Sequence, residues 1–202
     1  MTCGCGENRN FCVKAGATFY PTIRWAQKTL TAAVITAITQ ATPVVITAPA
    51  HGLPNGWPAA VVGVQGMTFI NSPDYPPYES DLHTGTVIDA NDVSFNDVSS
   101  ALWSPYVAPG GSLVYYTPQP LAGVTFAMSF YTDAQMATTP LIVLSVGSGI
   151  TVDDTNMLIL PVLQTDALPT GWPTTQPTYY KLTATDTSGD IIEIMSGTFT
   201  LE

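Results

Sequence analysis

The sequence consists of short runs of strand-forming residues that Gly and Pro interrupt every few positions. Thr, Val and Ile contribute 58 of the 202 residues, and Gly and Pro contribute another 33. β-Branched residues favour strands, whereas Gly and Pro favour turns and end regular elements. In residues 124–131, Phe126, Met128 and Phe130 alternate with smaller or polar residues. This period of two is typical of a half-buried strand. The chain is therefore predicted to be all-β.

Individual strands follow from the same alternation. Apolar residues at positions 19, 21, 23 and 25 predict one face of an extended strand, and Pro21 indicates that it is an edge strand or carries a bulge. We expect Phe126, Met128 and Phe130 to pack against Ile23 and Trp25 in the core. Residues 187–190, Thr-Ser-Gly-Asp, predict the turn of a C-terminal hairpin. Residues 67–70 are expected to form a strand, and 163–168 are the only segment in which one helical turn is expected.

The charge balance excludes two classes of partner. Five Lys and Arg stand against fifteen Asp and Glu, which gives a formal net charge of −10 and a pI near 4.2. Such a chain does not attract nucleic acid or an anionic membrane surface. No apolar run approaches the roughly 20 residues of a membrane-spanning helix, and the N-terminal residues lack the apolar stretch of a secretory signal.

Residues 29–180 contain no Lys or Arg at all. Few salt bridges can form on such a surface, and Thr, Ser, Asn and Gln must carry most of its hydration. Low charge density favours association, because charge repulsion helps to keep soluble monomers apart. We interpret the chain as a subunit of a larger assembly. The alternative is an ordinary acidic secreted or environmental protein.

Four stretches, residues 13–25, 120–133, 148–154 and 179–201, resemble the N-terminal β-sandwich module of baseplate upper proteins of tailed bacteriophages. In that module a G-x-T-F strand opens the fold and a D-x-x-G hairpin closes it. Residues 33–71 resemble a small β-domain that recurs in phage tail and fibre proteins. The positions that carry this second likeness are Pro43, Val45, Thr47, His51-Gly52, Asn55-Gly56, Val61, Gly66-Met67, Asn71 and Phe95. This sequence departs from the pattern at Trp57-Pro58, where the family carries a charged residue.

The resemblance implies an Ig-like β-sandwich with an inserted small β-barrel-like domain. Together with the loop signals, it places a flexible N-terminal tail at 1–11, the sandwich at 12–31 plus 112–202, and the inserted domain at 32–111. It further implies a noncatalytic structural subunit of the phage particle, made in the host cytoplasm and located in the virion. Its expected place is the tail or baseplate, where it would attach to other virion proteins in multiple symmetric copies. The alternatives are a capsid-surface or head-fibre subunit, or a carbohydrate-binding module.

Candidate chemical sites have simpler structural explanations. Cys3, Cys5 and Cys12 have the spacing C-x-C-x6-C, which is unlike a zinc ribbon or finger. A disulfide or reduced thiols are the other interpretations. His51, which precedes Gly52, is expected to fix a turn through bonds to backbone groups, and His83 is expected to form a surface pair with a carboxylate.

The carboxylates show no catalytic or calcium-binding pattern. The pairs Asp153-Asp154 and Glu79/Asp81 are candidates for glycoside hydrolysis, but neighbouring residues on a strand face opposite ways. Asp89, Asn91 and Asp92 lack the order of an EF-hand and predict a hairpin turn. We therefore expect no catalytic residue, cofactor or metal site.

Aromatic residues in Pro-rich loops are the strongest candidates for an interface. Tyr and Trp on loops serve as anchors for neighbouring subunits or as platforms for sugar rings. The alternative is that they cover a small core under long loops. The predicted interface residues are Tyr75, Tyr78, Trp103 and Tyr106, with Tyr115 and Tyr116 in the same aromatic set.

Overall fold

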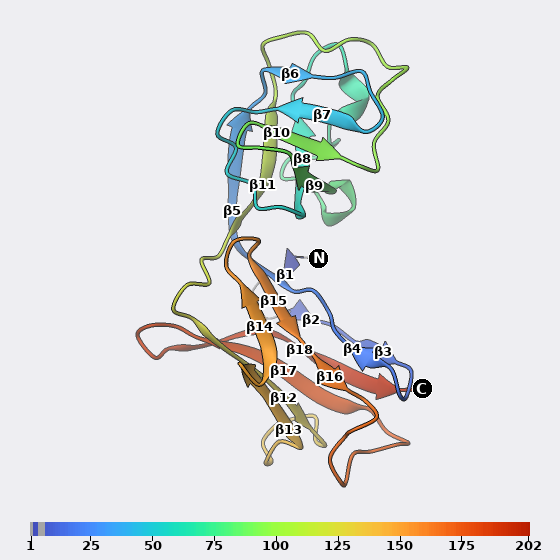
Figure 1. The fold of residues 1–202 in the computed structure, drawn as a ribbon, viewed down its shortest axis with the longest axis vertical. Coiled ribbons are helices and arrows are strands. Elements are labelled where there is room, and N and C mark those ends of the chain that lie inside the picture. The colour runs from blue at the N-terminus through green and yellow to red at the C-terminus, as the bar shows by residue number, and fades with distance from the viewer. Residues whose placement is uncertain (1, 4–6) are drawn as a thin grey trace. The chain divides into compact units, whose positions relative to one another are not determined.

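The computed structural model describes residues 2–3 and 7–202 of the chain (Figure 1). It is 47% strand and 3% helix, which confirms the all-β prediction. Its helices within the described ranges are two 3-10 turns, η1 (Thr68–Ile70) and η2 (Glu79–Asp81). No helix in this part of the chain is long and apolar enough to cross a membrane.

The chain divides into two compact units. Unit 1 comprises Met1–Ala26 and Pro118–Glu202, and unit 2 comprises Gln27–Thr117. The boundaries expected from the sequence, 31/32 and 111/112, lie a few residues inside the limits of unit 2. Strands β5 (Arg24–Val34) and β11 (Ser112–Pro118) are neighbours in one sheet, so most of their length belongs with unit 2.

Unit 1 is built on one large sheet with the order β15-β14-β13-β12-β17-β18. The central pairs β12–β17 and β17–β18 are antiparallel, whereas β13 and β14 run parallel. The turn of the β17–β18 hairpin lies at 186–190, so the predicted C-terminal hairpin is confirmed. The strands are β12 (Thr125–Tyr131), β13 (Ile142–Val146), β14 (Gly149–Asp153), β15 (Leu158–Pro161), β17 (Thr178–Thr185) and β18 (Ile191–Leu201).

Alternation along β12 produces the core of unit 1. Phe126, Met128 and Phe130 are fully buried and belong to one apolar cluster with Ile23 and Trp25. The rings of Trp25 and Phe126 meet edge to face with their centroids 6.4 Å apart. The predicted packing of this face is therefore confirmed.

The N-terminal segment differs from the expected tail through residue 11. Strands β2 (Glu7–Asn8) and β3 (Phe11–Val13) pair in parallel with β18, and β1 (Thr2–Cys3) pairs in parallel with β5. Between β2 and β3, the amide of Arg9 donates to Ser196 O at 2.7 Å, and the hydroxyl of Tyr180 donates to Arg9 O at 2.7 Å. The segment is held by its own chain because β18 offers an unpaired edge to its backbone.

Two local predictions are wrong. Residues 163–168 form no helical turn, since β16 (Leu163–Gln164) instead pairs antiparallel with β4 (Thr18–Phe19). Leu163 is buried there in the core of unit 1, so tertiary packing outweighs the weak helix signal. The expected strand at 67–70 is the 3-10 turn η1.

Unit 2 forms a second curled sheet in the order β5-β11-β8-β9-β10-β7-β6. The pairs β8–β9, β9–β10, β10–β7 and β7–β6 are all antiparallel. Long loops at 63–82 and 96–111 leave this sheet and contain the aromatic residues of interest. The remaining strands are β6 (Ala37–Ile38), β7 (Val44–Thr47), β8 (Trp57–Val62), β9 (His83–Val87) and β10 (Asp92–Phe95).

Candidate interaction surface

Buried Ser100 anchors the loop at 96–111 to the β6–β7 connection. Its amide donates to Ala41 O at 3.0 Å, and its hydroxyl donates to Thr39 O at 2.7 Å. The side chain of Gln40 then donates to Trp103 O at 2.5 Å. These bonds fix the backbone on both sides of Leu102.

Tyr106 braces the other half of this loop. Its hydroxyl oxygen lies 2.9 Å from the carbonyl oxygens of both Ile35 and Gly110 and accepts a hydrogen bond from Gly110 N at 2.9 Å. The ring is half-buried. Tyr106 therefore holds the loop in place through its hydroxyl, and its predicted part in an interface stays a prediction.

The segment 63–72 lies against this loop. The side-chain amide of Asn71 accepts from Val64 N at 2.8 Å and donates to Val64 O at 3.0 Å. The amide of Val107 donates to Gln65 O at 3.0 Å. Gly66 has φ of +78°, and a Cβ there would lie only 2.1 Å from Pro105 O. Only glycine allows the two segments to approach this closely.

Together the two segments present an exposed apolar surface. Phe69 on η1 meets Trp103 with ring centroids 5.9 Å apart. Phe69 is 80% exposed, Leu102 is 99% exposed and Val107 is 53% exposed, whereas Trp103 is half-buried. We call Phe69, Leu102, Trp103 and Val107 the apolar tip of unit 2. Large apolar side chains held this far out on a fixed backbone are typical of interaction sites.

Tyr75 and Tyr78 lie on a separate part of the loop at 71–82. They are 68% and 65% exposed. Asp81 holds this part, because its Oδ2 accepts from Tyr78 N at 3.3 Å and from the hydroxyl of Ser72 at 3.1 Å. Figure 1 shows η2, next to Tyr78, well apart from η1. The structure thus places the predicted residues in two groups.

Sequence reasoning missed Phe69 and Leu102 as exposed residues. It also grouped Tyr115 with the loop aromatics, although Tyr115 is buried and its hydroxyl donates to His51 O at 2.6 Å. One available signal was the absence of Asp, Glu, Lys and Arg from both 29–73 and 98–132. These two stretches contain every residue of the apolar tip.

His51 fixes the turn before Gly52, as predicted. Its Nδ1 accepts from Leu53 N at 2.9 Å, and its Nε2 lies 3.1 Å from Asp89 O, to which it donates in the matching neutral tautomer. Gly52 supplies φ of +65°. The imidazole is buried and its two nitrogens are used by backbone groups, which favours a structural role.

Replacing His51 with Ala should destabilise unit 2 by about 1–3 kcal/mol, because the buried amide of Leu53 loses its acceptor. Urea unfolding measures the change. His83→Ala is the matched control, since His83 is partly exposed and pairs with Asp97 at 2.7 Å. A surface pair of this kind contributes less than about 1 kcal/mol. Equal losses in both variants would contradict the role given to His51.

The carboxylates considered for chemistry close turns. Asp153 Oδ1 accepts from Thr155 N and Asn156 N, both at 3.0 Å, and Asp89 Oδ1 accepts from Asn91 N at 2.7 Å. The turn predicted at Asp89, Asn91 and Asp92 is confirmed. The Asn156 side chain, the backbone amides and the nearby guanidinium of Arg24 lower the pKa of Asp153.

Asp133 and Asp186 have lowered pKa values for the same reason. The hydroxyl of Thr138 bonds to Asp133, and the hydroxyl of Ser188 bonds to Asp186, in each case reinforced by backbone amides. A carboxyl whose pKa is lower in the folded state stabilises the fold above its ordinary value of 3.8.

The free energy of unfolding should therefore fall from about pH 5 downwards, as the pH approaches and passes the folded-state pKa values. Urea unfolding at stepped pH measures this loss. Asp186→Asn should flatten the dependence, because an amide does not titrate. Asp166→Asn serves as the matched control. A profile that stays unchanged in Asp186→Asn would contradict the contribution assigned to this turn.

The cysteines lie partly outside the described residues. Cys5 and the side chain of Cys3 belong to that part, so their proposed metal or disulfide roles stay predictions. Cys12 is an exposed free thiol whose pKa is raised, chiefly by the hydrogen bond that the thiol donates to the carboxylate of Glu202. Within residues 2–3 and 7–202, no three His, Cys, Asp or Glu side chains gather closely enough to hold a metal ion.

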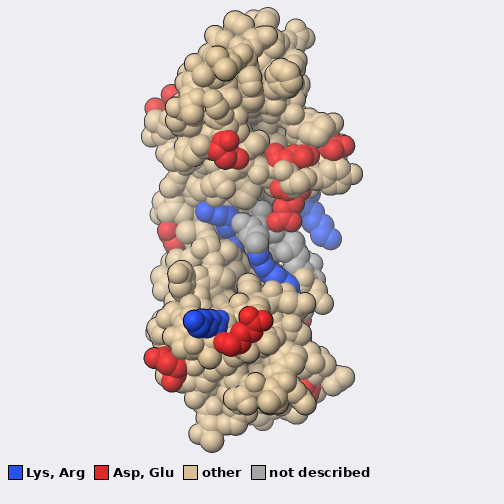
Figure 2. Space-filling model, turned by 90° about the vertical axis from the view of Figure 1, so that its right-hand side faces the viewer, with Lys and Arg blue, Asp and Glu red and all other residues tan. Residues whose placement is uncertain are grey.

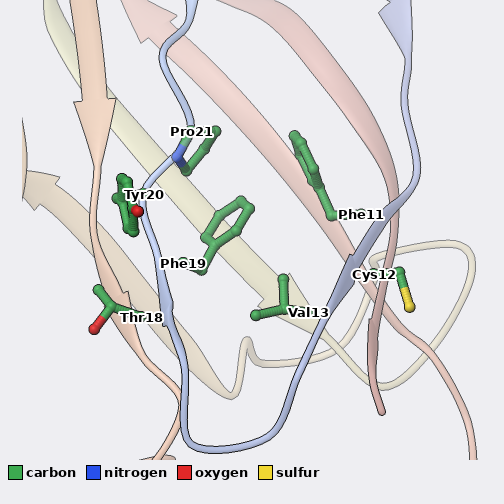
Figure 3. A pocket seen from close by; sticks show the side chains of 7 residues that line it. All are labelled: Phe11, Cys12, Val13, Thr18, Phe19, Tyr20 and Pro21. Carbon is green, nitrogen blue, oxygen red and sulfur yellow. The ribbon is translucent and has the colours of Figure 1, made fainter.

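An apolar pocket of about 230 Å³ opens in unit 1 between β3 and the segment 18–21. Figure 3 shows Phe11, Val13 and Phe19 pointing into this space, whereas the thiol of Cys12 points away from it. Among the lining side chains, the hydroxyl of Thr18 donates to Gln164 Oε1 at 2.8 Å. The lining carries no ionised group that could act as an acid, a base or an anion ligand.

The comparisons with known proteins add no identification. The sequence matches no protein-family model, and it matches no curated protein. Function must therefore be argued from the apolar tip, the charge distribution and the resemblance in the sequence.

Proposed function

We propose that the chain is a noncatalytic structural subunit of a bacteriophage particle, in the tail or baseplate, which attaches to other subunits through unit 2. The observation that carries this proposal is the apolar tip. Leu102 is held far into solvent by a loop that Ser100 and Tyr106 anchor to the sheet, and Phe69 is held there by the neighbouring segment, which Asn71 closes onto Val64. Exposed apolar patches of this kind mark interaction sites, and a subunit covers such a surface on assembly.

The residues that carry the resemblance support the proposal through their structural roles. His51-Gly52 closes one turn, and Asn55 accepts from Val87 N at 3.1 Å beside Gly56, which has φ of +72°. Asn71 clamps Val64, and Phe95 is fully buried. Each position is used to shape unit 2, as expected for a module that recurs as a scaffold. Trp57, at the point of departure, is buried and donates to Tyr116 O at 2.9 Å.

The surface charge also supports a subunit role. On the face drawn in Figure 2, most atoms belong to neither cationic nor anionic residues. The end of unit 2 at the top of this view shows no charged residue. Only 10% of the residues are charged, so electrostatic repulsion between adjacent subunits would arise at only a few places on the surface.

Mass spectrometry of purified phage particles whose genome encodes this chain tests the proposal. The chain should be present in several copies per particle, and an electron-microscopy map should place unit 2 against another subunit. A chain that is abundant in the lysate and absent from purified particles would contradict the proposal. Glycan binding lost in Tyr75→Ala and kept in Tyr20→Ala would instead favour the carbohydrate-binding alternative.

A further inference from the structure

The turn between His51 and β8 contains a chemically reactive pair of residues, Asn55-Gly56. It is the one Asn-Gly pair among the seven asparagines of the sequence. Asparagine followed by glycine is the pair most prone to deamidation, because glycine has no side chain to hinder attack by its backbone nitrogen. Asn55 is exposed, so solvent water reaches its side-chain amide. The pair therefore has the chemistry of a modification site.

Deamidation at this pair needs water and no other co-reactant. The backbone nitrogen of Gly56 loses its hydrogen to solvent and forms a bond to Cγ of Asn55. The bond from Cγ to Nδ2 breaks, and Nδ2 takes up a proton from solvent and leaves as ammonia. Water then opens the cyclic imide at one of its two carbonyl groups. The product is aspartate or isoaspartate, and in isoaspartate the main chain runs through Cγ.

Strand β9 holds both reacting groups of this pair. The amide of Gly56 donates to Gly85 O at 2.8 Å, and Asn55 Oδ1 accepts from Val87 N at 3.1 Å. The nitrogen can lose its hydrogen to solvent only when the first bond opens. The side-chain amide can turn onto that nitrogen only when the second bond opens. The closed turn therefore opposes the reaction twice, through partners on a single strand.

The turn is also fixed on the side that leads into β8. The amide of Trp57 donates to Pro54 O at 3.1 Å and closes a four-residue turn in which Gly56 supplies φ of +72°. Trp57 is fully buried, and its Nε1 donates to Tyr116 O at 2.9 Å. Asn55-Gly56 can therefore leave β9 only if the packing around Trp57 opens with it.

We infer that Asn55 is a deamidation site that the closed fold of unit 2 keeps unreacted. When unit 2 opens, Asn55 reacts, and the change is irreversible. Isoaspartate adds a methylene group to the main chain, so the bond from Trp57 to Pro54 and the register of β8 against β9 cannot both re-form. A chain whose unit 2 has opened is thus marked by chemical modification. The inference is independent of the proposed function.

Mass spectrometry of peptides from the full chain tests the inference. The chain is incubated in mildly alkaline buffer without urea and at stepped urea concentrations, and the deamidated fraction of the peptide containing Asn55 is followed with time. The rate in the folded chain should be at least about tenfold below that of the unfolded chain, because the reaction follows the open population. It should rise along the urea transition of unit 2. Equal rates in the folded and the unfolded chain would overturn the inference.

Two variants test the part played by opening. His51→Ala, in which Leu53 N loses its acceptor, should raise the rate at Asn55 about tenfold without urea, because more of unit 2 is open. His83→Ala is the matched control. His83 lies on β9 itself but forms only a partly exposed pair with Asp97, so the rate should change by about twofold or less. A His51→Ala chain that is less stable and yet reacts at the parent rate would overturn the inference, as would an equal increase in both variants.

Discussion

Phe130→Ala should lower the free energy of unfolding of unit 1 by about 3–5 kcal/mol, the usual loss for a large aromatic residue in a packed core. Phe130 is fully buried at the centre of the aromatic cluster. Its ring centroid lies 5.4 Å from that of Phe199, 5.6 Å from that of Trp172 and 6.1 Å from that of Tyr180. The substitution leaves a cavity between these three rings that rigid strands cannot close.

Urea unfolding followed by tryptophan fluorescence measures this loss, because Trp172 reports on the environment of Phe130. Circular dichroism should accompany it, since two units can unfold in separate steps. Phe69→Ala is the matched control and should stay within about 0.5 kcal/mol of the parent chain, because Phe69 is mostly exposed. Equal effects of the two substitutions would contradict the assigned core.

The large strands could be predicted from the sequence because their signal is local. In β12 the buried positions Phe126, Met128 and Phe130 alternate with residues that face out, so period two alone identifies the strand and its buried face. The β17–β18 turn is equally local, because Asp186 accepts from Ser188 N and Asp190 N at 2.9 Å. Neither feature depends on a distant part of the chain.

The N-terminal strands could not be predicted because their partner is distant. Glu7–Asn8 and Phe11–Val13 are too short to show a period, and they pair with β18, almost the whole chain away. These strands form because β18 offers a free edge to their backbone. They also need the absence of a side chain at Gly197, where a Cβ would collide with Arg9 O. A parallel pairing of this kind leaves no pattern in either segment alone.

Residues 67–70 show the opposite error, in which a local signal is overruled. Met67, Phe69 and Ile70 favour a strand by composition, but Gly66 turns the chain and brings it against Pro105. Met67 and Ile70 are then buried while Phe69 points outward. The exposed apolar residue of this segment is therefore one whose exposure composition would not suggest.

The candidate site could be predicted by residue type and location only in part. Pro-rich aromatic loops do contain exposed side chains, among them Tyr75 and Tyr78. Residue type does not distinguish a tyrosine whose hydroxyl braces the backbone, such as Tyr106, from one that stands free. Leu102 carries no aromatic signal, and its exposure follows from the bonds that Ser100 and Trp103 make on either side.

The second large effect is expected at Gly197. A Cβ at this position would lie 1.9 Å from Arg9 O and 2.6 Å from Arg9 C, so Gly197→Ala must push the N-terminal segment away from β18. The backbone of Arg9 cannot move without losing its bonds to Ser196 and Tyr180. Phe11, which packs on Phe19 and Tyr180, would leave its place with it. We expect a loss of about 3 kcal/mol, the upper end of the usual range for overpacked sites.

Hydrogen exchange distinguishes this local displacement from a general loss of stability. In Gly197→Ala the amide of Arg9 should lose its protection, while amides in the β12–β17 pair keep theirs, because the backbones of β12 and β17 bond to each other and β17 reaches Arg9 only through the hydroxyl of Tyr180. Gly110→Ala is the matched control, since a Cβ there meets no atom within 4 Å. It should leave the exchange of Arg9 unchanged. Protection of Arg9 that survives in Gly197→Ala would show that the segment does not lie along β18, and residues 7–11 would then return to the role of a free tail.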